Sequence, residues 1–428
     1  MHEESAGVVC CTACTVSHLP RARVAASSWR EHHPDSAFFV LLLDHDGRPD
    51  DGEAFRTLRP EELGLSTQEL AVQQGIYDAY ELSCAVRPPL MRLLLERGAP
   101  SVIFTDTDTR FYAPVHDLGD TAATAGLVLV PAAMRPVAAR RYFPTGETEY
   151  RWLMNGLFNA GLLVVGPGGR AFLDWWAGWL ARDSLIERSA GMWADQLWID
   201  WAPVYFEHVI CRDTSLNVTF WSLDERELHE LDGRLMLDGG PLRHFHFVGF
   251  DPRRPELFFT HYPGMVDYYR NEYGRDAPAL PPNPALDRLL REYTDSLLEA
   301  GSEELRERPY DYEVSAGGRP LGRRERAIYR EAVLAAEARG TDLPPSPFDP
   351  SRSEEFDRLV DDPASLRSLS PQARRRLERL RPAGVSRGSL GRMARRLPAA
   401  FRYALTEQAP AELAVHGRVA SDTVRLEY

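Results

Sequence analysis

Two aspartates stand two positions apart in the stretch "SVIFTDTDTRFYAP" (101–114), directly behind a short apolar run. The run predicts a buried strand that ends at Asp106 and Asp108. In open α/β sheets, ligands bind at the carboxyl ends of the strands, where these carboxylates would lie. Carboxylate oxygens suit Mg²⁺ or Mn²⁺, which are often shared between protein carboxylates and substrate phosphates. The pair therefore indicates a divalent metal site, although two solvated carboxylates in a turn would give the same pattern.

Two histidines occur in a second stretch, "RHFHFVGFDP" (243–252), where polar and aromatic residues alternate. The alternation predicts a strand that enters a loop at a Gly and Pro break. A neutral imidazole binds Mn²⁺ alongside carboxylates. If this strand and the strand before Asp106 run parallel in one sheet, we expect their ends to converge. A histidine packed and hydrogen-bonded inside a strand remains the alternative for each of His244 and His246.

The elements that must position these side chains begin with a βαβ pattern. The segments "GVVCCTA" (7–13) and "AFFVLLL" (37–43) predict buried strands, and the chain between them has helical spacing. A helix is expected before the aspartates in "ELSCAVRPPLMRLLLERGAP" (81–100), and another strand in "FNAGLLVV" (158–165). This pattern predicts a parallel sheet flanked by helices.

The amino-acid composition of the chain changes after about residue 275. A Pro-rich linker, "DAPALPPNPALD" (276–287), leads into a charged and helical-looking remainder. We expect a catalytic α/β domain over 1–275, a helical extension over 276–365 and an Arg-rich C-terminal segment over 366–428.

Composition narrows the function classes. The 428 residues carry a formal net charge of -13, and the sequence contains no lysine. An acidic body argues against nucleic acid as a partner, because phosphate contacts need a basic surface. No apolar run approaches a membrane span, and the start lacks a secretory signal, so we expect a cytoplasmic protein. The five cysteines are odd in number and scattered, which predicts buried thiols rather than disulfides or a metal site.

The Arg-rich tract 371–396 contrasts with the acidic body. Such a block can dock on anionic lipid, which would give weak peripheral contact with the inner face of the membrane. A solvated tail that neutralises acidic surface elsewhere explains the same composition.

Four motifs together resemble a known family. "VIFTDTDTRFY", "FNAGLLVV", "ADQLW" and "HFVGFDP" occur in the order and at roughly the spacings of GT-A-fold glycosyltransferases, most nearly the retaining enzymes of glycosyltransferase family 8. The resemblance covers about residues 6–262. It implies an α/β GT-A (Rossmann-like) fold, with a mostly parallel sheet flanked by helices and followed by the helical C-terminal extension. It also implies metal-dependent transfer of a sugar from a nucleotide diphosphate sugar, a UDP-sugar in most of the family, to a glycan, lipid, peptide or small-molecule acceptor, with retention.

The same resemblance implies roles for individual residues. Asp106, Asp108 and His246 would hold Mn²⁺ or Mg²⁺ against the diphosphate, and His244 falls outside this ligand set. Asn159 would face the donor sugar, with Asp195 and Gln196 beneath the anomeric carbon. The remaining donor-binding residues would be Thr12 at the base pocket, Arg87 at the phosphates, and Thr107 and Gly249 beside the metal ligands.

One motif departs from the family. The family follows H-F-x-G with Lys-Pro-Trp, whose lysine contacts the leaving diphosphate, whereas this chain has Phe250-Asp251-Pro252-Arg253. Either Arg253 or Arg254 would substitute, or the diphosphate is held differently. Two other functions fit the motifs: a nucleotidyltransferase on a similar sheet, and a catalytically silent sugar-nucleotide or glycan-binding protein. A metallohydrolase is disfavoured because no third histidine or H-E-x-x-H helix accompanies the pair.

Overall fold

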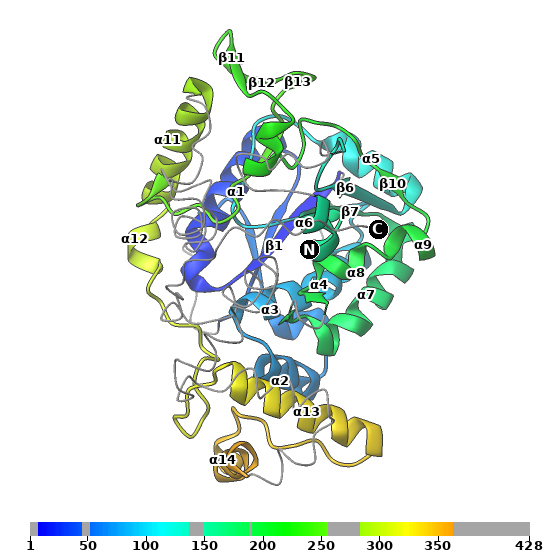
Figure 1. The fold of residues 1–428 in the computed structure, drawn as a ribbon, viewed down its shortest axis with the longest axis vertical. Coiled ribbons are helices and arrows are strands. Elements are labelled where there is room, and N and C mark those ends of the chain that lie inside the picture. Colours follow the sequence, from blue (N-terminus) through cyan, green and yellow to red (C-terminus); the bar gives the residue numbers. More distant parts are fainter. Residues whose placement is uncertain (1–6, 45–51, 137–148, 188–190, 256–282, 363–428) are drawn as a thin grey trace, which may run out of the picture.

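A central seven-stranded sheet organises the chain (Figure 1). The computed structural model describes residues 7–44, 52–136, 149–187, 191–255 and 283–362. In spatial order, the strands of the sheet are β3 (Arg56–Leu58), β2 (Phe38–Leu42), β1 (Val9–Cys14), β4 (Val102–Thr105), β7 (Phe158–Val165), β6 (Leu127–Pro131) and β10 (Val209–Ile210). Only β7 runs antiparallel to its neighbours, β4 and β6. The predicted fold class, a mostly parallel sheet flanked by helices with a helical C-terminal region, is confirmed.

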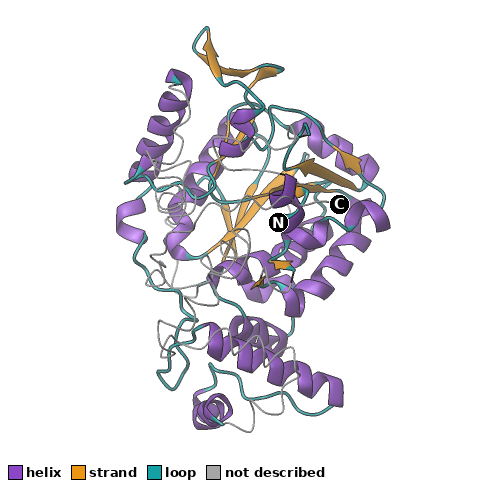
Figure 2. Cartoon of the chain, viewed as in Figure 1, coloured by secondary structure: helices purple, strands orange, loops and turns teal. Residues whose placement is uncertain are grey.

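Helices cover both faces of this sheet (Figure 2). They are α1 (Leu19–His32), α2 (Thr67–Ile76), α3 (Ala79–Ala85), α4 (Arg87–Glu96), α5 (His116–Ala125), α6 (Glu149–Asn155), α7 (Arg170–Asp183), α8 (Gln196–Ile199) and α9 (Ala202–Tyr205). One face packs against α1 and α5, and the other against α2, α3, α4 and α7. Successive strand residues point to opposite faces, so strands covered on both sides are buried along their whole length and mostly apolar, as β1, β4 and β7 are.

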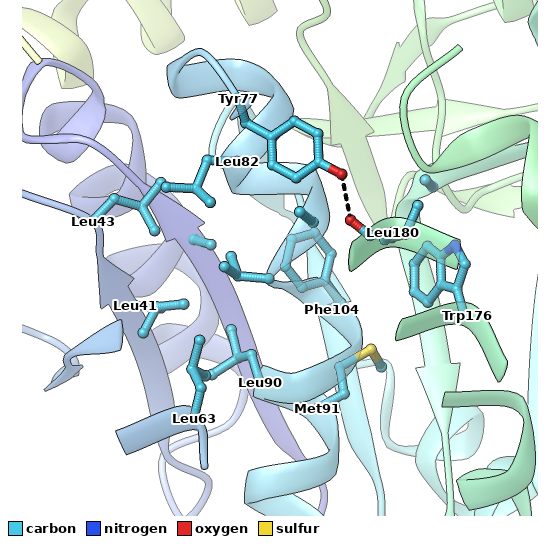
Figure 3. Close-up of a cluster of buried hydrophobic side chains, with 14 of the residues drawn as sticks. Leu41, Leu43, Leu63, Tyr77, Leu82, Leu90, Met91, Phe104, Trp176 and Leu180 are labelled. Atoms are coloured by element: carbon cyan, nitrogen blue, oxygen red, sulfur yellow. Dashed lines mark hydrogen bonds between the residues drawn. The ribbon is translucent and has the colours of Figure 1, made fainter. Parts of the chain in front are cut away.

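The core on the second face is built around large side chains (Figure 3). Phe104 of β4 and Trp176 of α7 are almost fully buried there. The hydroxyl of Tyr77, between α2 and α3, donates to the carbonyl oxygen of Leu180 at 2.7 Å. This bond lets a tyrosine enter the core without leaving its hydroxyl unpaired.

The C-terminal helices share their cores with the sheet domain. They are α11 (Pro284–Glu299), α12 (Ser302–Leu305), α13 (Arg323–Arg339) and α14 (Ser353–Asp361). Tyr293 of α11 stacks on Phe247 with ring centroids 3.6 Å apart, and α13 packs on α2. Arg326 of α13 is buried and donates to the carbonyl oxygens of Gln74, Gly75, Tyr77, Tyr312 and Leu321. The domain boundaries expected at 275 and 365 stay predictions.

Smaller sheets complete the structure. One is a three-stranded antiparallel sheet of β11 (His229–Leu231), β12 (Arg234–Leu237) and β13 (Gly240–Pro241). The others are the pair β8 (Ile186–Glu187) with β9 (Met192–Trp193), and the pair β5 (Thr109–Phe111) with β14 (His244–His246). The last pair positions the candidate site.

Candidate metal centre

Two short strands bring the predicted metal ligands together. Asp106 follows β4, Asp108 directly precedes β5, and His246 is the last residue of β14. β14 pairs antiparallel with β5, and His246 lies opposite Thr109. The condition on which the convergence was expected, that the histidine strand runs parallel in the same sheet, is therefore not met. The convergence is nevertheless observed, because a two-stranded ladder beside the sheet replaces the shared sheet edge.

The three side chains form one cluster. One potential ligand atom from each of Asp106, Asp108 and His246 lies within 4.8 Å of the others. His246 Nε2 is 3.1 Å from Asp108 Oδ1 and 3.6 Å from Asp106 Oδ2. His246 is 2% exposed, while the two aspartates are partly exposed. The carboxylates therefore present a face to solvent from which an ion can enter.

The cluster has the donor chemistry of a divalent metal site. Two carboxylates and one imidazole are a suitable set for Mn²⁺ or Mg²⁺, and Nε2 of His246 is turned toward both carboxylates. Nδ1 of the same ring faces Asn217 Oδ1 at 3.3 Å, a partner of the kind that orients metal-bound histidines. The described residues thus fit a divalent cation at this position.

The pKa values of His246 and Asp108 are shifted in the directions that favour positive charge at the cluster. Burial alone would lower the pKa of His246, but the charge of Asp108, the hydrogen bond to it and the charge of Asp106 raise the pKa above 6.5. Burial would likewise raise the pKa of Asp108, yet His246 and Arg21 hold it well below its usual range. A metal ion bound through Nε2 must displace the imidazolium proton, so metal binding should weaken in acid.

His244 occupies a different environment from His246. Its Nε2 is 3.1 Å from the Thr105 hydroxyl, and its ring packs on Phe111. Burial lowers the pKa of His244 to about 3. The side chain is fully buried and lies outside the metal cluster, which agrees with the packed-strand interpretation.

Arg87 connects the cluster to Asp195. Its Nη2 lies 2.6 Å from Asp106 Oδ1, and its Nη1 lies 2.9 Å from Asp195 Oδ2. Nη1 also donates to the carbonyl oxygen of Ala160 at 3.2 Å. Burial raises the pKa of Asp195, and Arg87 opposes that rise. Arg87, the first residue of α4, thus forms ion pairs with two carboxylates that were predicted as site residues.

Asn159 and Gln196 contact each other. Asn159 lies in β7, and its Nδ2 donates to Gln196 Oε1 at 3.2 Å at the start of α8. Asn217, which the sequence motifs do not include, donates from Nδ2 to Asn159 Oδ1 at 3.1 Å. The structure therefore brings both predicted amide residues to the cluster, together with a third that was missed.

Gly161, in the same "FNAG" motif, was also missed as a site residue. A Cβ at this position would lie 2.3 Å from Cε1 of His246, so the imidazole fits only against a glycine. The sequence analysis identified the FNAG motif as a whole. The close approach of the His246 ring to Gly161 explains why the motif has a glycine at this position.

The three remaining predicted residues differ in their surroundings. Thr12 lies inside β1 and is fully buried, and its hydroxyl has no hydrogen-bond partner within the described parts of the chain. Thr107 is half-buried between the two aspartates. Gly249 is exposed, with a φ of 70° that favours glycine. Their predicted contacts with a donor stay predictions.

Arg21 of α1 also contacts the cluster. Arg21 Nη1 lies 3.6 Å from Asp108 Oδ2, and Nη2 donates to the carbonyl oxygen of Phe250 at 2.7 Å. Arg253, one of the two arginines considered as a substitute for the family lysine, forms an ion pair with Asp251 at 2.9 Å. Arg21 was not singled out because all 50 basic residues are arginines and its segment carries no motif.

The five cysteines are free thiols, and Cys84 forms a side-chain hydrogen bond with Asp195. Cys10, Cys11, Cys14 and Cys84 are buried free thiols, and burial raises their pKa values. Across the described ranges, no helix has the length and apolar character that crossing a membrane requires. The Arg-rich tract 371–396, on which the peripheral contact was predicted, lies outside the described residues.

Comparisons with known proteins give distant similarities. No family model matches the chain. The uncharacterized protein YfnD of Bacillus subtilis (strain 168) is 22% identical over 250 residues, covering 55% of this chain and 75% of YfnD. Two structures of the galactosyltransferase LgtC, one with donor and acceptor sugar analogues and one of an active-site mutant, cover 68% of this chain and 95% of their own at 16% identity and a TM-score of 0.35. At this sequence identity a likeness bears on the fold alone, and at this TM-score it supports no inference about the reaction.

Proposed function

We propose that the protein is a metal-dependent glycosyltransferase that moves a sugar from a nucleotide diphosphate sugar, a UDP-sugar by resemblance, to an acceptor such as a glycan, lipid, peptide or small molecule. The observation that carries the proposal is the cluster of Asp106, Asp108 and His246, which segments far apart in the sequence bring within 4.8 Å. The sequence motifs support the same reaction, since the three residues are those that the glycosyltransferase resemblance implies as metal ligands.

The cluster suits the charge change of such a reaction. When the bond between the anomeric carbon and the diphosphate breaks, negative charge builds on the phosphate oxygens. A bound Mn²⁺ or Mg²⁺ would stabilise that charge as a Lewis acid. Asp106, Asp108 and His246 would hold the ion, and Arg87 would fix Asp106 through the 2.6 Å ion pair.

Arg21 is our candidate for the cation that neutralises the diphosphate beside the metal. Its guanidinium is anchored on the Phe250 carbonyl and lies 3.6 Å from Asp108 Oδ2, on the partly exposed side of the cluster. Arg253 is half-exposed and held by Asp251. This assignment replaces the suggestion from the motif that Arg253 or Arg254 takes the lysine's place.

We also keep three finer expectations as proposals. Retention of the anomeric configuration and contacts of Asp195, Gln196 and Asn159 with the sugar follow from the resemblance. Cytoplasmic localisation with weak membrane contact follows from composition. A role for Thr12, Thr107 and Gly249 in binding the donor completes the set.

The test is release of nucleoside diphosphate from a panel of sugar nucleotides with Mn²⁺, comparing the wild type with Asp108→Asn. We expect the variant to lose at least about 1,000-fold in turnover, because a lost metal ligand removes several kcal/mol of charge stabilisation. Asp174→Asn, an exposed carboxylate on α7 paired with Arg92, is the matched control and should keep full activity. Arg21→Ala should weaken UDP binding, whereas Arg253→Ala should not.

Three results would contradict the proposal. Full turnover in Asp108→Asn would remove the metal site from the reaction. Pyrophosphate released from a nucleoside triphosphate, instead of nucleoside diphosphate from a sugar nucleotide, would favour the nucleotidyltransferase alternative. Binding of sugar nucleotides with no product from any acceptor would favour the silent binding protein.

A further inference from the structure

A chain of hydrogen bonds between side-chain amides leads from the backbone to the metal-facing histidine. Gln196 Oε1 accepts from Asn159 Nδ2 at 3.2 Å, and Asn159 Oδ1 accepts from Asn217 Nδ2 at 3.1 Å. Asn217 Oδ1 then faces His246 Nδ1 at 3.3 Å, and His246 Nε2 faces Asp108. Three amide groups in series therefore end on the imidazole ring.

Two backbone N–H groups decide which way the amides point. Gly161 N donates to Asn159 Oδ1 at 2.9 Å, and Ala160 N donates to Gln196 Oε1 at 3.1 Å. A backbone N–H can only donate, so both side-chain atoms must be the carbonyl oxygens. Asn159 Oδ1 then requires a donor from Asn217, which turns the Asn217 carbonyl oxygen toward His246.

Both ring nitrogens of His246 face oxygens that only accept: Nδ1 faces the amide oxygen of Asn217, and Nε2 faces the carboxylates. A divalent cation bound at Nε2 would take the lone pair of that atom, so the hydrogen would stay on Nδ1 with Asn217 Oδ1 as its acceptor. We propose that Asn217, oriented by Asn159, is a positioning residue that accepts the Nδ1 hydrogen of His246 and so holds Nε2 toward a divalent cation. The proposal rests on the metal role of the cluster that the proposed function assigns.

The backbone at Asn217 supports a dedicated role for this side chain. Asn217 has a φ of 46° and is 4% exposed. Asparagine tolerates this left-handed conformation better than most residues, and such positions persist where the surrounding structure enforces them. Gly161 fixes the other side of the ring, since a Cβ there would lie 2.6 Å from Nδ1 of His246. The ring is therefore held between a glycine and an oriented amide.

The proposal assigns Asn159 a second task, beside the sugar contact implied by resemblance. Both ends of its amide are engaged within the chain of amides, as are both ends of Gln196, whose Nε2 donates to the carbonyl oxygen of Asn155 at 2.7 Å. Side chains with every polar atom engaged are suited to holding a neighbour in place. Asn159 would act on the metal site through Asn217.

One variant removes the amide, and a second variant controls for the change of backbone. Asn217→Gly accepts the positive φ and removes the acceptor, whereas Asp232→Gly makes the same kind of change at an exposed position with a φ of 50°. The metal-free full-length chain is labelled with ¹⁵N-histidine, and the exchange of its imidazole N–H hydrogens with water is measured from the one-bond ¹H–¹⁵N signals. His246→Gln identifies the signal by its loss. Mn²⁺ alone is then titrated into each variant.

We expect the wild type and Asp232→Gly to show a slowly exchanging Nδ1–H signal for His246, and Asn217→Gly to lose this signal to rapid exchange with water. Mn²⁺ affinity should fall by about 10–100-fold in Asn217→Gly, the usual loss when the partner of a metal-bound histidine is removed, and should stay unchanged in Asp232→Gly. A slowly exchanging Nδ1–H signal retained in Asn217→Gly, or an Mn²⁺ affinity equal to that of the wild type, would overturn the proposal.

The readouts separate this proposal from the proposed function. A wild-type chain that binds no Mn²⁺ contradicts the metal-dependent reaction, while hydrogen exchange at Nδ1 in the metal-free protein still decides whether Asn217 holds the ring. Conversely, sugar transfer together with unchanged Nδ1–H exchange in Asn217→Gly would support the proposed function and show that Asn217 does not position His246.

Discussion

Arg87, beside the metal cluster, and Arg326, between α2 and the C-terminal helices, are two buried arginines with opposite kinds of partner. Arg87 is 4% exposed and forms ion pairs with Asp106 and Asp195, while its Nε has no hydrogen-bond partner in the described structure. Arg326 is 5% exposed and donates to backbone carbonyl oxygens. Nearby carboxylates hold the pKa of Arg87 above its usual value against the effect of burial, whereas burial lowers the pKa of Arg326.

The difference separates a region arranged around charge from a region arranged around contacts. The carbonyl groups that bind Arg326 are neutral dipoles, so they stabilise its buried charge at the joint between α2 and α13 without cancelling it, and the carboxylates around it contribute only through their charge. The carboxylates that bind Arg87 stay close to a third one, Asp108, and to a histidine whose pKa is raised. Clustered carboxylates that one arginine does not fully neutralise are a feature of sites that bind cations.

The largest expected effect comes from removing the cation of the charged region. Arg87→Met should lower the free energy of unfolding by about 4 kcal/mol, because Asp195, 2% exposed, loses its counter-charge inside the protein. Urea denaturation measures the loss. Arg92→Met, on the same helix but paired at the surface with Glu96 and Asp174, should change stability by less than about 1 kcal/mol.

A second substitution tests the cause of that loss. Asp195→Asn in the Arg87→Met background removes the stranded charge and should restore part of the stability. If the double variant is no more stable than Arg87→Met, or if Arg87→Met and Arg92→Met are equally stable, the contrast between the two arginines fails.

His33 sharpens the comparison as a buried base without a carboxylate. Its Nδ1 contacts the carbonyl oxygen of Trp29, its Nε2 accepts from Val115 N, and burial, with a contribution from His116, lowers its pKa to about 4. The unfolded chain, with a pKa near 6.5, therefore binds more protons between pH 6.5 and 4, so stability falls as the pH drops through this window. The loss should reach about 3 kcal/mol below pH 4.

Denaturation at a series of pH values checks this expectation. His33→Gln should be less stable at neutral pH but should show a flatter decline between pH 6.5 and 4. Parallel curves for the variant and the wild type would show that His33 is not held neutral by the fold.

The smallest expected effect comes from Arg326, between α2 and α13. Arg326→Met should lower the free energy of unfolding by about 2 kcal/mol, because the methionine fills the volume while carbonyl oxygens at the end of α2 lose their donors. Mn²⁺ affinity should stay unchanged, since the joint shares no partner with the metal cluster. Calorimetric titration with Mn²⁺ measures it, and a weakened affinity would show that the two regions are coupled.

The sequence predicted the core strands and the three clustered ligands, but not how they meet. Apolar runs and the Asp106–Asp108 pair are local signals that can be read without coordinates, and His246 was identified through the resemblance of its local H-F-x-G motif. The antiparallel pairing of β14 with β5 depends on tertiary contacts of two three-residue strands, which carry too little pattern to fix a direction.

The missed residues explain the limit in physical terms. Asn217 acts through a positive φ and one amide orientation, neither of which leaves a mark in composition or periodicity. Arg21 and Arg326 were hidden because arginine is the basic residue throughout this chain. Their importance comes from partners contributed by distant segments, namely Asp108 with Phe250 and the carbonyls around Tyr77.

The ladder between β5 and β14 also bears on how the chain folds. Asp108 and His246 are separated by 138 positions, so a large loop must close before the imidazole meets the carboxylate. Loop closure over this length is entropically costly, and contacts of this range form slowly. An ion that binds both segments would stabilise only chains that have already closed the loop. It would therefore slow unfolding far more than it would speed folding.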